Sequence, residues 1–126
     1  MSTVTLVRKV LLLDRDANWT TQWFKELGKR IRTVELLAIG KREEGTLRLF
    51  SLPGMKAVVI DAGFAGNLTE TTKFIKQARG SFDGYIIGTT AVESCYSSLV
   101  TAGCDLVCPK NQVVDSLIAL LGQQEV

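Results

Sequence analysis

The chain has 126 residues, 46% of them hydrophobic and 22% charged, which is typical of a soluble globular protein with one domain. Its 15 basic and 13 acidic residues give a net charge of +2, too small to favour nucleic acid or a membrane surface as a direct partner. Histidine is absent, which excludes Ser-His and Cys-His catalytic pairs and removes the commonest zinc ligand.

The first half of the chain alternates between strand and helix patterns. It predicts a strand at 8–14 (RKVLLLD), a helix at 17–30, a strand at 33–38 and a short helix at 46–52. The helix at 17–30 carries an apolar stripe that we interpret as core: Trp19, Trp23, Phe24 and Leu27. Basic residues in this half are mixed with four glutamates, which indicates a solvated face. They are Lys25, Lys29, Arg30, Arg32, Lys41, Arg42 and Arg48.

The second half continues the alternation. It predicts strands at 57–61 (AVVID), 85–90 (YIIGTT) and 105–110 (DLVCPK), with helices at 68–79, 92–103 and 112–121. Gly103 suits a left-handed helix end, and Asn111 is expected to cap the last helix. Continuous apolar strands between helices predict an α/β fold. We expect a doubly wound five-stranded parallel sheet of order 2-1-3-4-5, with helices on both faces.

Polar residues gather at the carboxyl ends of the predicted strands, where such sheets place their ligands. These residues are Asp14, Arg15, Asp16, Asp61, Thr89, Thr90 and Lys110. Together, acids, a hydroxyl and an ammonium can bind a hard cation and a phosphoryl group. Taken alone, Asp61 is also explained as a strand-ending carboxylate capped by backbone amides. No glycine-rich phosphate loop is present to support nucleotide binding.

Over essentially its whole length, the chain resembles the receiver domain of bacterial two-component response regulators. The resemblance rests on VLLLDRD, AVVID, TTA and the gap-free AGCDLVCPK. It implies that Asp61 is the phospho-acceptor, Thr90 (or Thr89) the switch hydroxyl and Lys110 the phosphoryl-contacting lysine. It also implies Mg²⁺ as cofactor, held by Asp14 and Asp61, with Asp16 as a substitute ligand.

The sequence departs from the receiver pattern at several positions. Arg15 replaces the second acid of the usual pair, and arginine does not ligate a metal. We expect its guanidinium either to pair with Asp61 or to point to solvent. Ala65 stands where the family has a proline, Val107 replaces the aromatic switch residue, and Asn111 replaces the proline after the lysine. These differences affect metal binding and signal relay.

Three hypotheses follow. The first is an atypical, non-enzymatic receiver that works as a protein–protein interaction switch, with an Arg15–Asp61–Lys110 charge cluster in place of the metal. The second is a phosphorylatable, Mg²⁺-dependent receiver served by a histidine kinase. The third is a flavodoxin-like module that binds a small ligand, although the acidic DRDANWT stretch is unlike a flavin phosphate loop.

The expected partners are a histidine kinase or a downstream effector. A homodimer through the last two helices and the fifth strand is also considered, with Tyr96 and Leu99 either exposed there or buried. Three cysteines, Cys95, Cys104 and Cys108, form no CxxC motif and suggest reduced thiols. No apolar run approaches the ~18 residues that span a bilayer, and the N-terminus lacks a secretory signal pattern. We therefore predict one cytoplasmic domain over residues 1–126.

Overall fold

The computed structural model describes residues 7–31 and 33–122. Its five strands are β1 (Arg8–Leu13), β2 (Val34–Ile39), β3 (Met55–Asp61), β4 (Tyr85–Thr89) and β5 (Leu106–Cys108). They form one parallel sheet of order β2-β1-β3-β4-β5, so the predicted fold class and strand order are confirmed.

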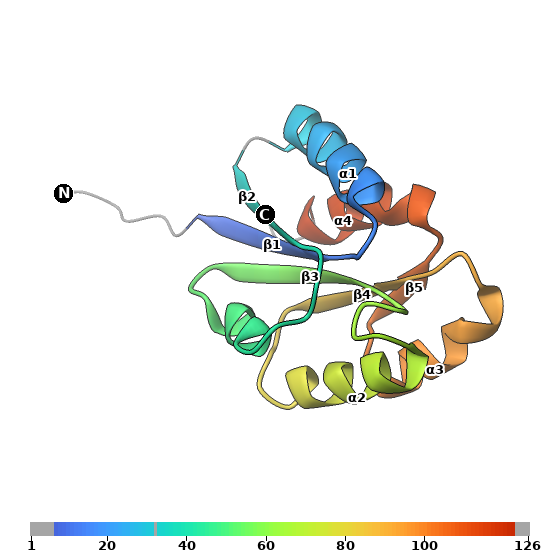
Figure 1. Ribbon diagram of the computed structural model, residues 1–126. Coiled ribbons are helices and arrows are strands. Elements are labelled where there is room, and N and C mark those ends of the chain that lie inside the picture. Colours follow the sequence, from blue (N-terminus) through green and yellow to red (C-terminus); the bar gives the residue numbers. More distant parts are fainter. Residues whose placement is uncertain (1–6, 32, 123–126) are drawn as a thin grey trace.

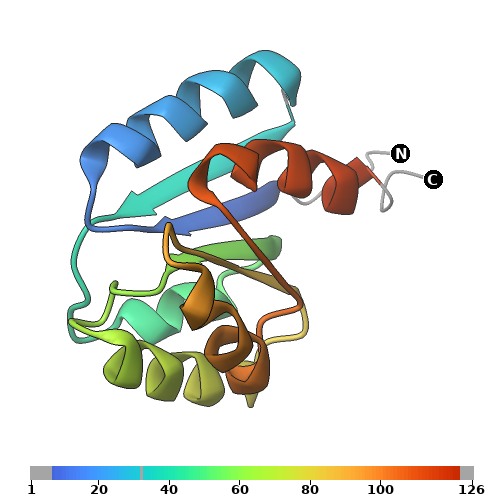
Figure 2. The same ribbon diagram turned by 90° about the vertical axis from the view of Figure 1, so that its right-hand side faces the viewer.

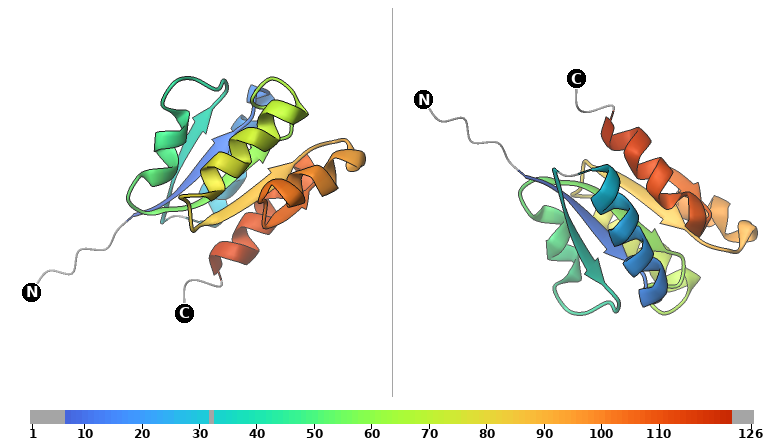
Figure 3. Two further views of the ribbon diagram at one scale, coloured as in Figure 1. Left: turned by 90° about the horizontal axis from the view of Figure 1, so that it is seen from below. Right: turned by 90° about the horizontal axis from the view of Figure 1, so that it is seen from above.

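Helices cover both faces of the sheet. The α-helices are α1 (Ala17–Arg30), α2 (Leu68–Arg79), α3 (Tyr96–Ala102) and α4 (Val113–Gly122), and the 3-10 helices are η1 (Thr46–Ser51), η2 (Glu93–Cys95) and η3 (Lys110–Gln112). Figure 1 shows α1 and α4 on one side of the sheet and η1, α2 and α3 on the other. The two views of Figure 3 show the two faces separately.

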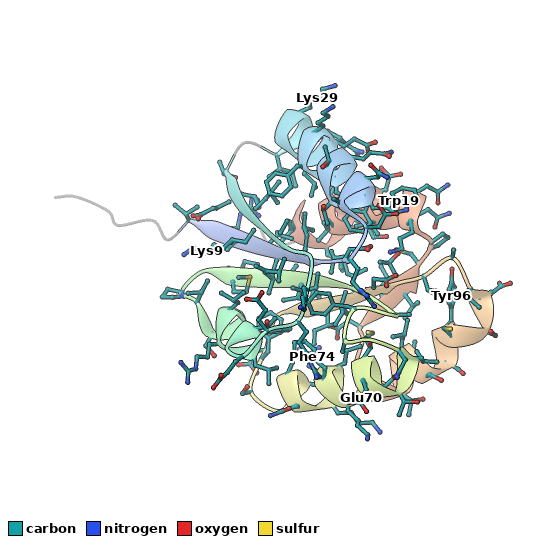
Figure 4. The ribbon with its side chains drawn as sticks, in the orientation of Figure 1. Lys9, Trp19, Lys29, Glu70, Phe74 and Tyr96 are labelled. Carbon is teal, nitrogen blue, oxygen red and sulfur yellow. The ribbon has the colours of Figure 1, made fainter. Side chains whose placement is uncertain are left out.

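Successive side chains of a central strand face opposite sides of the sheet, and both sides are covered by helices, so the strand reads in the sequence as a run of apolar residues. In β1, Leu11 and Leu13 face the η1–α2–α3 side, whereas Val10 and Leu12 face the α1–α4 side. All four are fully buried, because each face of the sheet has a helical layer above it. Figure 4 shows Phe74 of α2 directed toward the sheet, while Lys29 of α1 points away from the protein.

The short helix expected at 46–52 is present as the 3-10 helix η1, but the helix predictions need two corrections. The helix expected at 92–103 is divided into η2 and a short α3. Asn111 is not the cap of the last helix. It lies inside η3, whose N-cap is Pro109, so the chain turns tightly at the lysine before α4 begins at Val113.

The apolar stripe of α1 is only partly core. Trp23 and Leu27 are buried, Trp19 is partly buried and stacks on Trp23, and Phe24 is 38% exposed. Gly103 ends α3 with a φ of +131°, as its predicted role in the helix end requires. Cys95, Cys104 and Cys108 are free thiols. No helix in residues 7–31 or 33–122 is long and apolar enough to cross a membrane.

Candidate functional site

The candidate site lies at the carboxyl edge of the sheet, where β1, β3 and β5 end. This edge is on the right-hand side of Figure 1 and faces the viewer in Figure 2. β1 and β3 are neighbours in register, with Leu13 opposite Ile60, so the residues that follow them emerge side by side. Three predicted residues, Asp14, Asp61 and Lys110, meet here in one ionic cluster, which we call the acid–lysine cluster.

Asp14 is the buried member of the acid–lysine cluster, with 2% of its surface exposed. Its Oδ2 accepts a hydrogen bond from Lys110 Nζ, and its Oδ1 accepts one from the backbone N–H of Asp16 at 2.8 Å. Both carboxylate oxygens therefore have donors, as a buried carboxylate needs. The sequence Asp-Arg-Asp builds this turn locally, because the third residue supplies the N–H.

Asp61 ends β3 and is partly exposed. Its Oδ1 lies 2.6 Å from Lys110 Nζ, and its Oδ2 accepts a hydrogen bond from Gly63 N–H at 2.8 Å. A Cβ at position 63 would lie 3.3 Å from that same oxygen, so the glycine allows the close approach. The expected capping of Asp61 by a backbone amide is confirmed, and its role as phospho-acceptor stays a prediction.

Lys110 reaches both acids because α1, on the same face of the sheet as α4, holds its backbone in place. The indole N–H of Trp23, on α1, donates a hydrogen bond to the Lys110 carbonyl at 3.1 Å. The ammonium also lies 5.7 Å from the centre of the Trp23 ring, within cation–π range. Only 11% of the lysine side chain is exposed, so the cluster is largely shielded from water.

Burial controls the protonation of Asp14. It raises the pKa of this carboxyl above the ordinary value of 3.8. The hydrogen bonds from Lys110 and from the Asp16 N–H act in the opposite direction but are the smaller effects, and the nearby charge of Asp61 adds slightly to the rise. One ammonium shared between two carboxylates therefore leaves the buried acid incompletely compensated.

Two threonines lie at the carboxyl end of β4, Thr89 as its last residue and Thr90 directly after it, and their environments differ. Thr89 pairs in register with Asp61 and is fully buried, and its hydroxyl has no hydrogen-bond partner among the described residues. Thr90 is 5% exposed, and its hydroxyl accepts a hydrogen bond from Val92 N–H at 3.0 Å. The hydroxyl of Thr90 thus holds the turn after β4, and the assignment of the switch hydroxyl to Thr90 rather than Thr89 stays a prediction.

The structure separates the two other charged residues of the Asp-Arg-Asp stretch from the cluster. Arg15 is exposed and, in the described part of the chain, forms no ion pair with Asp61. Asp16 is the N-cap of α1, and its carboxylate accepts from Asn18 N–H at 2.9 Å. The expected Arg15–Asp61–Lys110 cluster is therefore corrected to Asp14–Asp61–Lys110, because the buried Asp14 contacts Lys110 whereas Arg15 is exposed.

As arranged, these residues do not fit Mg²⁺. The ion needs near-octahedral oxygen ligands at about 2.0–2.1 Å, whereas here an ammonium bridges the two carboxylates that would hold it. The expected substitute ligand, Asp16, uses its carboxylate to cap a helix. Within residues 7–31 and 33–122, no three acidic or cysteine side chains are grouped to hold a metal.

Trp23 and Gly63 are the site residues that the sequence interpretation missed. The helical spacing of Trp23 predicts a core residue, and its ring is indeed buried. That prediction does not consider the indole N–H, which donates to the Lys110 carbonyl. A buried tryptophan needs a hydrogen-bond acceptor, and that requirement was the available signal. Gly63 gave no comparable signal, since its role depends on the conformation of the loop after β3.

The sequence matches no protein-family model, and no curated protein matches it either. Solved structures do match. A two-component response regulator from Clostridium difficile superposes with a TM-score of 0.75 at 14% identity, covering 94% of this chain and 99% of that one. The BeF3-activated N-terminal receiver domain of Klebsiella pneumoniae RstA gives a TM-score of 0.72 at 18% identity, covering 92% and 97%.

A third similar structure contains a modified site. It is a response regulator from Burkholderia pseudomallei with a phosphorylated aspartic acid, a calcium ion and citrate. Its TM-score is 0.71 at 16% identity, over 90% of this chain, which spans 66% of the length of that one. At these identities the likeness establishes the fold, and this chain has the fold of response-regulator receiver domains.

Proposed function

We propose that this chain is an atypical receiver domain, a non-enzymatic switch for protein–protein interaction, with Asp61 at the phospho-acceptor position. The proposal takes residues 1–126 as one cytoplasmic domain. Its partners would be a histidine kinase or a downstream effector. The receiver fold supports the class of function, and the charge arrangement at the carboxyl edge of the sheet supports the atypical character.

The observation that carries the proposal is the double contact of Lys110. Its ammonium contacts the carboxylates of both Asp14 and Asp61. A divalent ion placed between these carboxylates would have to displace the ammonium and would then lie close to it. Arg15, the residue after Asp14, adds a positive charge at this edge where a metal-binding receiver has an acid. The lysine therefore occupies the position between the two carboxylates and compensates part of their charge.

The phosphorylatable alternative makes the opposite prediction about Asp61. Wild-type protein and Asp61→Asn are incubated with Mg²⁺ and a small phosphodonor, and in parallel with beryllofluoride, and intact masses are compared. We expect the same mass pattern for both proteins, because Lys110 holds Asp61 and excludes the metal. A mass gain on wild type that is missing from Asp61→Asn would contradict the atypical assignment and support a working phosphorelay receiver.

The docking surface of the proposed switch is the face formed by α3, β5 and α4. Val100 of α3 and Leu106 of β5 are 55% and 37% exposed, whereas Leu99 is fully buried and Tyr96 partly so. Leu106 also lines a shallow pocket of about 400 Å³ against α4 residues such as Ala119 and Leu120. Exposed apolar side chains beside a shallow pocket suit a protein partner.

A second copy of the chain is one partner that can be tested directly. We expect sedimentation to show a concentration-dependent dimer that Leu106→Arg weakens. The matched control is Val7→Arg, at an exposed valine next to the amino end of β1. A monomer at every concentration, or equal loss in both variants, would contradict the homodimer and leave a different protein as the partner.

A further inference from the structure

A second charged feature lies at the same edge of the sheet, outside the acid–lysine cluster. Three loops, those after β1, β2 and β3, enclose an open pocket of about 360 Å³. Its charged side chains are Arg15 from the first loop and Lys41 and Arg42 from the second. The third loop contributes Phe64 and Gly66, and Phe64 is 2% exposed, so it packs beneath the pocket. We call this feature the basic pocket.

The positive charges of the basic pocket have no acidic counterpart in its lining. No acidic residue lines it, and in the described part of the chain none of the three cations forms an ion pair. All three side chains are exposed. Like charges held in one concavity repel each other, and they raise the local concentration of anions.

The acidic residues near this edge are engaged or directed elsewhere. Asp14 and Asp61 share Lys110, and the Asp16 carboxylate caps α1. Glu43 and Glu44 follow Arg42 and line a neighbouring pocket beside η1 and α2, which Arg42 also lines. Neither glutamate lines the basic pocket or forms an ion pair with its cations among the described residues. Lys41 and Arg42 are exposed, as the sequence interpretation of a solvated face expects.

We propose that the basic pocket binds a small molecule through a diphosphate group. The guanidinium groups of Arg15 and Arg42 and the ammonium of Lys41 would form charge-assisted hydrogen bonds with the diphosphate oxygens. A phosphate monoester carries roughly −1.5 to −2 charges at pH 7 and leaves part of three positive charges unmatched. A diphosphate matches them more closely. The volume, near the lower end for ligand sites, admits such a group with a small attached moiety.

Binding here would act on the loop that also holds Asp61. Phe64 N–H donates to the Asp61 carbonyl, and Gly66 N–H donates to the Gly63 carbonyl, each at 3.0 Å. A ligand against Phe64 and Gly66 therefore contacts the same turn whose Gly63 amide binds the Asp61 carboxylate. The basic pocket thus gives this chain a route for an anionic metabolite to influence the receiver site, independent of aspartate phosphorylation.

Calorimetric titration and amide NMR spectra test the proposal, with EDTA present so that no metal competes for the ligand. The probes are inorganic pyrophosphate, ADP and adenosine. We expect the first two to bind and to shift amide signals of Arg15, Gly40 and Gly66, with affinity falling as salt rises. Adenosine should not bind. Equal affinity for pyrophosphate and ADP supports a bare diphosphate ligand, whereas tighter ADP binding supports a nucleotide.

Three variants, Arg15→Gln, Lys41→Gln and Arg42→Gln, keep polar side chains but remove one charge each. Each should weaken pyrophosphate binding by about tenfold or more, as loss of a charged hydrogen bond does. The matched control is Lys25→Gln, an exposed lysine of α1 outside the pocket, which should bind like wild type. Failure of pyrophosphate and ADP to bind, or equal weakening by Lys25→Gln, would overturn the proposal. These variants leave Asp61 unchanged, so the result is independent of the phosphodonor experiment.

Discussion

The acid–lysine cluster and the basic pocket occupy one edge of the sheet but handle charge in opposite ways. In the cluster, Lys110 is 11% exposed and bonds two carboxylates within the protein. In the pocket, three cations are exposed and form no ion pair in the described part of the chain. Asp14 belongs to the first and Arg15, the next residue, to the second. Burial forces compensation inside the fold, while exposure leaves charge available to a ligand.

The comparison is tested most strongly by removing the lysine of the cluster. Lys110→Met leaves two carboxylates without their shared donor, and Asp14 is buried. We expect the free energy of unfolding to fall by roughly 3–5 kcal/mol, as when one partner of a buried ion pair is deleted. Guanidinium unfolding followed by circular dichroism measures the loss.

Two further variants of the chain serve as controls for the unfolding measurement on Lys110→Met. Lys25→Met removes an exposed lysine from α1 and should change stability by less than about 0.5 kcal/mol. The double variant Asp61→Asn/Lys110→Met should lose less than the sum of its single changes, because fewer unpaired charges remain. If Lys110→Met cost no more than Lys25→Met, the acid–lysine cluster would not be a buried structural unit.

A smaller effect is expected in the pH dependence of stability at Asp14. Since burial raises its pKa in the folded protein above 3.8, the folded state binds the proton more tightly than the unfolded chain. The free energy of unfolding of wild type minus that of Asp14→Asn should therefore be greatest below pH 3.8 and decline as pH rises through the folded pKa. A difference that increased over this range would show that pairing with Lys110 outweighs burial.

Asp16 should behave as a helix cap rather than as a member of either charged feature. Asp16→Ala removes the acceptor of Asn18 N–H and should cost about 1 kcal/mol. Asn67→Ala, which removes the equivalent acceptor of Glu70 N–H at the start of α2, is the matched control. Thermal or chemical unfolding should give similar losses for the two. A much larger loss for Asp16→Ala would place Asp16 in the acid–lysine cluster.

The smallest stability effect is expected at Arg15. Arg15→Gln removes an exposed charge that makes no ion pair within the described residues, so stability should stay within about 0.5 kcal/mol of wild type. The same unfolding assay used for Lys110→Met measures it. A loss approaching that of Lys110→Met would indicate that Arg15 pairs with Asp61, as the sequence alone had allowed.

Much of the fold could be predicted from the sequence because its signals are local. Continuous apolar runs predict the strands, and amphipathic segments between them predict most helices. The predicted strand order is confirmed. The failures are also local in origin. Asn111 has the chemistry of a cap, but Pro109 starts a 3-10 turn and the helix begins at Val113. Phe24 fits the apolar spacing of α1, yet the helix turns it partly to solvent.

The sequence by itself determined that Asp14, Asp61 and Lys110 would reach one edge of a parallel sheet, because each lies within two residues of the carboxyl end of a strand. Only the tertiary structure decided which cation pairs with these acids. Arg15 is adjacent to Asp14 in the chain but is exposed, whereas Lys110 lies in η3, after a strand two positions away from β3, and is held by Trp23. Side-chain direction at a strand end depends on the turn that follows, and that turn is shaped by contacts distant in sequence.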